Sequence, residues 1–161
     1  MLLFADNPGQ INALADENGN GKYYKLKTVV DTGATSSVLP PDECPDIPIE
    51  DSPGSLNGQT FTSASGGVMK NQGQKRFAFV SNEWDRLGMK YNVADMQQGS
   101  TSVGEICDEG DGNTFVVFTK YGGYIGSPQL GTTTGFDRAG TGAPYLMTQW
   151  VEKPGFHRPG Q

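Results

Sequence analysis

The segment that most constrains the fold is residues 28–40, where an apolar run leads into an acid and a glycine turn and then becomes apolar again. A strand with two consecutive valines would carry Asp31 to the edge of the interior, where a carboxylate can act as a general acid or base. Gly33 permits a sharp turn, and the hydroxyl of Thr32 with nearby N–H groups could fix the acid by hydrogen bonds. Asp, Thr and Gly are also common turn residues, so an ordinary turn after a strand is the alternative.

The Asp-Thr-Gly-Ala sequence at 31–34, with apolar pairs before and after it, resembles the active-site segment of the retropepsins, the retroviral and retrotransposon type of aspartic protease. The resemblance implies an all-β fold of the retropepsin-like, closed β-barrel type with one short helix. It also implies that Asp31, Thr32 and Gly33 form the catalytic loop and that Ala34 contacts the substrate.

The motif occurs only once in the chain. Peptide hydrolysis by carboxylates needs two acids that share a proton, because one deprotonates water while the other protonates the scissile carbonyl. No second Asp-Thr-Gly or Asp-Ser-Gly is present. We therefore expect the second aspartate to be Asp31 of another copy, brought close by a two-fold axis, and we expect the monomer to have no peptidase activity.

Residues 60–80 are typical of a strand, a glycine-rich tip and a return strand. A protease that closes over an extended peptide needs a hairpin that excludes water and donates backbone hydrogen bonds. Retropepsins carry their flap at this place after the catalytic loop, which makes the tip residues Ser65, Gly66, Gly67 and Val68 candidates for substrate binding. A surface hairpin without a binding role is the alternative.

Val103-Gly104 resembles a second landmark of the retropepsins, an apolar residue and a glycine that follow a strand beneath the catalytic loop. By this resemblance Val103 is a candidate substrate-binding residue, and residues 105–109 are expected to form the short helix. Two positions depart from the family. Ser102 stands where an apolar residue is usual, and Glu105 replaces the basic residue whose ion pair supports the dimer in viral members.

Composition supports a β-rich protein and excludes several partners. Twenty-three glycines and ten prolines among 161 residues favour short strands joined by tight turns. A net charge of −6 argues against nucleic acid and anionic membrane as partners. No run approaches the roughly 20 apolar residues of a membrane span, and the apolar start is too short for a secretory signal. We therefore expect an intracellular protein, in the cytoplasm or within a virus-like particle.

The two cysteines, Cys44 and Cys107, lie far apart and in no metal-ligand spacing. Two free thiols in a reducing compartment are favoured over a disulfide. No metal site and no other cofactor is expected.

One retropepsin-like domain is expected over residues 1–152, followed by a tail over 153–161. Within the domain, residues 127–143 are rich in Gly and Thr and predict a loop. Residues 145–151 predict a final strand that could close the barrel or pair across a dimer. The apolar residues 2–4 could join a sheet between subunits or belong to a frayed terminus.

These features together predict an aspartic endopeptidase that acts as a homodimer. One Asp31 from each chain would activate a water molecule, and the substrate would be an extended peptide, such as a segment of the polyprotein from which such domains are cut. Mildly acidic conditions should favour cleavage because one of the two carboxyls then stays protonated. The alternative is a retropepsin-fold module that no longer cleaves and acts in binding or assembly.

Overall fold

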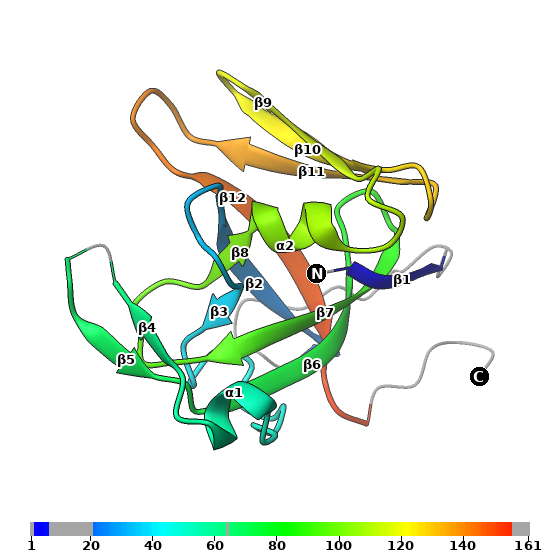
Figure 1. Cartoon of the computed structure of the whole chain (residues 1–161). Coiled ribbons are helices and arrows are strands. Elements are labelled where there is room, and N and C mark those ends of the chain that lie inside the picture. The colour runs from blue at the N-terminus through cyan, green and yellow to red at the C-terminus, as the bar shows by residue number, and fades with distance from the viewer. Residues whose placement is uncertain (1, 7–20, 64, 156–161) are drawn as a thin grey trace.

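The computed structural model describes residues 2–6, 21–63 and 65–155, with only the backbone path given for 2–6 (Figure 1). The described residues form twelve strands and two short helices, which confirms the all-β expectation. The helices are α1 (Pro53–Leu56) and α2 (Val103–Asp108). The strands are β1 (Leu2–Asp6), β2 (Tyr23–Asp31), β3 (Val38–Leu39), β4 (Thr60–Thr62), β5 (Val68–Lys70), β6 (Gly73–Val80), β7 (Arg86–Val93), β8 (Ser100–Ser102), β9 (Phe115–Thr119), β10 (Gly122–Ser127), β11 (Thr132–Arg138) and β12 (Tyr145–Glu152).

The strand pairings are organised around β2 and β12, which run antiparallel along most of their length. On its other edge β2 pairs in parallel with β8, and β8 leads through β3 to β7. β6 pairs with both β7 and β12. The pairings therefore lead from β12 through β2, β8, β3, β7 and β6 back to β12. Along β2, Leu26, Thr28 and Val30 are buried while Lys25 and Lys27 are exposed, because successive side chains of a strand point to opposite faces.

β9, β10 and β11 form an antiparallel extension that joins the first residues of β12 (Figure 1). The expected loop over residues 127–143 is corrected here, because Thr132–Arg138 is the strand β11 and pairs with β10 along six residues. Thr132, Thr134 and Phe136 are its buried residues, and β-branched threonines suit a strand well. The predicted final strand at 145–151 is confirmed as β12, and its partners lie within the same chain.

Two clusters of buried side chains form the core. The larger one lies among the strands of the β2–β8–β3–β7–β6–β12 circuit and consists of Leu26, Leu39, Cys44, Ile47, Phe77, Phe79, Leu87, Met89, Tyr91 and Val151. The smaller one joins α2 to the β9–β11 extension and consists of Val30, Ile106, Ile125, Phe136 and Met147. Val30 immediately precedes Asp31, so the smaller cluster anchors the base of the candidate catalytic loop.

The helices differ from the sequence-based expectation in number and bounds. Two short helices are present instead of one, and α2 begins at Val103 rather than at 105 because the side chain of Ser102 caps it. No helix in the described part of the chain combines the length and apolar character that a membrane crossing needs. The strand β1 pairs with β7 of its own chain.

Candidate active site

Asp31 is the last residue of β2 and is half-buried. The backbone N–H of Gly33 donates a hydrogen bond of 2.8 Å to Asp31 Oδ1. A Cβ atom at Gly33 would lie 3.4 Å from the same oxygen, so the turn brings the backbone close to the carboxylate. Thr32 and Gly33 are themselves exposed. The strand and the turn thus present an oriented carboxylate at the protein surface.

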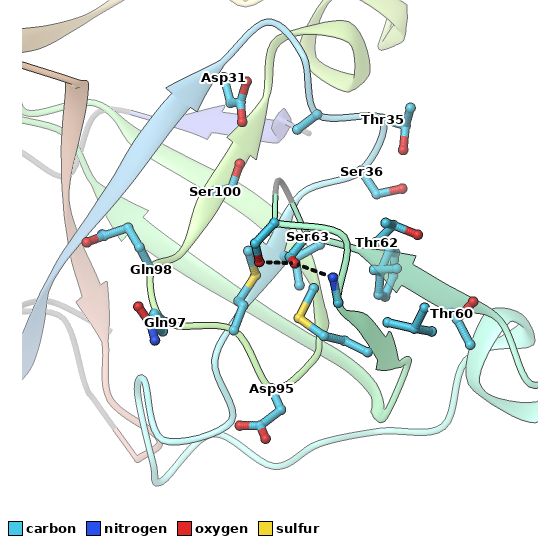
Figure 2. Close-up of a pocket in the computed structure, with 18 of the residues that line it drawn as sticks. Asp31, Thr35, Ser36, Thr60, Thr62, Ser63, Asp95, Gln97, Gln98 and Ser100 are labelled. Carbon is cyan, nitrogen blue, oxygen red and sulfur yellow. Dashed lines mark hydrogen bonds between the residues drawn. The ribbon is translucent and has the colours of Figure 1, made fainter. Parts of the chain in front are cut away.

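Asp31 opens on a groove of about 1160 Å³. Three parts of the chain line it, as Figure 2 shows for most of the side chains: the loop after β2, the β4–β5 hairpin, and the segment between β7 and β8. The groove-lining residues are Val29, Asp31, Gly33, Ala34, Thr35, Ser36, Val38, Gln59, Thr60, Phe61, Thr62, Ser63, Ser65, Gly67, Val68, Met69, Asp95, Met96, Gln97, Gln98 and Ser100.

The β4–β5 hairpin is a two-stranded sheet of its own and projects from the body of the protein (Figure 1). Its tip is tied by Ser63 Oγ, which accepts a hydrogen bond of 3.0 Å from the N–H of Gly67 and lies 3.0 Å from Ser65 Oγ. Gly66 has φ +91°, a conformation that glycine adopts readily. Val68 remains 69% exposed. A hairpin with few buried side chains can open and close at low energetic cost.

The return arm of this hairpin is shorter than expected. β5 ends at Lys70 and β6 begins at Gly73, where φ is +133° and the N–H bonds to the side chain of Asn71. Phe77 and Phe79 therefore belong to β6 and are buried in the larger core cluster. The hairpin at the position of the predicted flap therefore has only two short strands, Thr60–Thr62 and Val68–Lys70.

The groove brings together most of the residues predicted from the sequence. Asp31, Gly33, Ala34, Ser65, Gly67 and Val68 line it, whereas Thr32, Gly66 and Val103 do not. Val103 is half-buried at the start of α2 and packs against the smaller core cluster, so its predicted role in substrate binding stays a prediction.

Ser102 and Glu105, the two departures from the retropepsin pattern, form hydrogen bonds with the loop that follows Asp31. Ser102 Oγ donates to the carbonyl of Ala34 at 2.7 Å and accepts from the N–H of Glu105 at 3.1 Å. The N–H of Ser102 donates to Ser37 Oγ at 2.9 Å. The carboxylate of Glu105 in turn accepts a hydrogen bond from the N–H of Ser37. The loop is thereby fixed at Ala34 and Ser37 to the start of α2 within one chain.

A buried polar cluster links four strands. It consists of Thr28 of β2, Tyr91 of β7, Thr101 of β8 and Gln149 of β12. Thr101 Oγ1 is 2.7 Å from both Thr28 Oγ1 and the hydroxyl of Tyr91. Gln149 Nε2 donates to the Tyr91 hydroxyl at 3.0 Å. Burial raises the pKa of Tyr91 to about 12, so the phenol stays neutral. The cluster joins β2, which carries Asp31, to β8, which carries residues of the groove floor.

Two polar residues of the groove carried no recognisable signal in the sequence. Asp95 lies in the groove at the opposite end from Asp31, and Ser100 lies between them (Figure 2). Ser100 reaches the groove because β8 pairs in parallel with β2, and Asp95 follows the end of β7, which pairs in parallel with β3. Local sequence does not reveal these long-range pairings.

Metal chemistry has no evident basis in the described residues. Residues 21–63 and 65–155 contain no group of three or more His, Cys, Asp or Glu side chains that could hold a metal ion. Cys44 is buried, Cys107 is half-buried, and both thiols are free. The side chains that line the groove carry carboxylate, hydroxyl, amide and thioether groups.

Comparison with known proteins gave no match to a family model, a curated protein or a solved structure. The function of the chain therefore has to be inferred from the groove and from the residues that line it.

Proposed function

We propose that the protein is an aspartic endopeptidase of the retropepsin type that acts as a homodimer. One observation carries the proposal: a single carboxylate, Asp31, is oriented by the N–H of Gly33 and opens on a groove flanked by a free-standing hairpin. An extended peptide in such a groove can bind by main-chain hydrogen bonds, with pockets for alternate side chains.

The proposed reaction uses one Asp31 from each of two chains. The ionised carboxylate takes a proton from a water molecule, whose oxygen attacks the carbonyl carbon of the scissile bond. The protonated carboxyl of the second Asp31 gives its proton to the carbonyl oxygen. When the tetrahedral intermediate collapses, the C–N bond breaks, the leaving nitrogen takes the proton held by the first Asp31, and the second Asp31 recovers a proton from a hydroxyl of the intermediate. Two carboxyls that share one proton are most effective in mild acid.

Several features of the chain support a two-fold arrangement of this kind. Thr32 and Gly33 are exposed next to Asp31, so the loop is accessible to a second copy. The circuit of pairings through β2, β8, β3, β7, β6 and β12 is compatible with the closed barrel of the retropepsins. Under the same proposal the natural substrate is a peptide or polyprotein, encountered in the cytoplasm or in a virus-like particle.

Peptide digestion by the purified chain tests the proposal. A peptide library should be cleaved at about pH 4 to 7, pepstatin should inhibit cleavage, and Asp31→Asn should abolish it. Asp137→Asn is the matched control, because Asp137 is exposed on β11 and lies outside the groove. Sedimentation should show a dimer. Cleavage by Asp31→Asn at the wild-type rate, or no cleavage by a wild-type dimer, would refute the proposal.

The alternative is a module that binds peptides or assembles without cleaving them. It is favoured by the hydrogen bonds from Ser102 to Ala34 and from Ser37 to Glu105, which fix the loop without help from a partner chain. Such a module would bind peptides in the groove equally well before and after Asp31→Asn, and wild-type protein would leave them intact.

A further inference from the structure

The charged residues that line the groove are both acidic. Among the described residues, Asp31 and Asp95 line it and no lysine or arginine does. Asp95 is exposed and forms no ion pair with any described residue. If Asp31 is engaged at the scissile bond, Asp95 is the acid of the groove that is left to meet a charged group of the ligand.

Two methionines line the same groove as Asp95. Met69 of β5 and Met96, which follows Asp95, are both half-buried. Methionine side chains are flexible and adapt to apolar groups of different shape. The aliphatic stems of lysine and arginine pack on such surfaces while their charged ends reach a polar group. An acid flanked by methionines is thus suited to a long basic side chain.

Ser100 gives an independent sign that the groove takes a polar ligand. Its side chain is only 8% exposed, and Ser100 Oγ has no hydrogen-bond partner among the described residues. It lines the groove floor between Asp31 and Asp95 (Figure 2). Buried hydroxyls in folded proteins nearly always have a partner. Less than 1 Å² of this Oγ atom is accessible, so a ligand would supply the missing hydrogen bond when the side chains around Ser100 move to admit it.

We propose that the groove selects peptides that carry a lysine or arginine. Asp95 pairs with the cationic end of that side chain, Met69 and Met96 pack against its stem, and Ser100 Oγ forms a hydrogen bond with the bound peptide. The inference rests on the proposed function for the presence of a peptide in the groove, and it names the class of peptide. It assigns specificity to Asp95 and leaves the cleavage chemistry with Asp31.

Binding to a non-cleaving protein tests the inference. The full chain with Asp31→Asn is titrated with fluorescent peptides in which each position in turn is Lys, Arg, Gln, Leu or Glu. At one position Lys or Arg should bind about fivefold more tightly than Gln, the upper range for an accessible ion pair, and Glu should bind less tightly. Added salt should reduce the difference.

Three variants then test which residues produce the preference for basic peptides. Asp95→Asn added to Asp31→Asn should lower the affinity of the basic peptide to that of the Gln peptide. Asp137→Asn, the same charge change outside the groove, should leave the preference intact. Ser100→Ala should lower the affinity for basic and for neutral peptides by the same factor. Circular dichroism and urea unfolding confirm that each variant is folded.

Equal affinity for Lys and Gln at every position, a basic preference that survives Asp95→Asn, or no binding of any peptide would overturn the inference. Its failure is distinguishable from failure of the proposed function. If wild type cleaves peptides but shows no preference for lysine or arginine, only the inference about specificity is overturned. If the protein prefers basic peptides through Asp95 but never cleaves them, only the proposed endopeptidase function is overturned.

Discussion

Replacing Ser102 by alanine should destabilise the protein more than the loss of an ordinary helix cap does. The side chain is fully buried, at 0% exposure. Its hydroxyl caps α2 at the N–H of Glu105 and also donates to the carbonyl of Ala34. Loss of a cap hydroxyl costs about 1 kcal/mol, and an acceptor left without its donor costs about 1–3 kcal/mol. We expect the free energy of unfolding to fall by roughly 2–3 kcal/mol.

Ser52→Ala is the matched control. Ser52 caps α1 and accepts a hydrogen bond of 3.1 Å from the N–H of Ser55, and its hydroxyl holds no second segment of the chain. Its loss should cost about 1 kcal/mol. Ser102→Thr keeps the hydroxyl and should recover most of the stability lost in Ser102→Ala.

Urea unfolding measures all three variants at one protein concentration, because the stability of a dimer depends on concentration. The midpoint should fall further for Ser102→Ala than for Ser52→Ala, with an unchanged dependence on urea. Equal losses for the two alanine variants would show that the bond to Ala34 contributes nothing, and would refute the view that Ser102 ties the catalytic loop to α2.

Two further substitutions test the packing around the site. Tyr91→Phe should cost about 1–2 kcal/mol near neutral pH by removing buried hydrogen bonds. Because the folded pKa of Tyr91 is raised from 10.0 to about 12, the neutral phenol stabilises the wild type below pH 10. That contribution is lost as the pH rises towards 12. Between pH 10 and pH 12, the free energy of unfolding measured by urea titration should fall less for Tyr91→Phe than for wild type. An equal fall in the two proteins would contradict the raised pKa of Tyr91. Gly123→Ala should cost at least about 2 kcal/mol in thermal unfolding, because its Cβ would lie 1.9 Å from the Val117 carbonyl oxygen and 2.6 Å from the Phe136 ring. Gly140→Ala should leave the thermal stability unchanged, because no atom lies within 4 Å of its Cβ position. Equal effects of the two substitutions would contradict the close packing around Gly123.

The parts of the fold that were predicted correctly have a strong local pattern. β2 shows alternating burial and ends at Asp31, and β12 is a run of apolar and β-prone residues bounded by Pro144. The turn at Gly33 could be foreseen because glycine permits a close approach to the preceding acid. In each case the sequence signal and the physical cause lie within a few residues of one another.

The parts that were missed depend on distant partners. β11 has a Gly- and Thr-rich sequence typical of loops, yet it forms a strand because β10 and β12 pair with its two edges. Ser100 reaches the groove through the pairing of β8 with β2, and Asp95 lies just after the end of β7, which pairs with β3. Local sequence does not encode these contacts, which arise from strand pairing across the chain.

The central claim is that each active site needs one Asp31 from each of two chains, and a mixing experiment tests it most directly. Wild-type and Asp31→Asn chains are unfolded together in equal amounts, refolded, and compared with wild type at the same total concentration. If dimers form at random and mixed dimers are inactive, about one quarter of the activity should remain. About one half would mean that each chain carries a complete site, and would contradict the account.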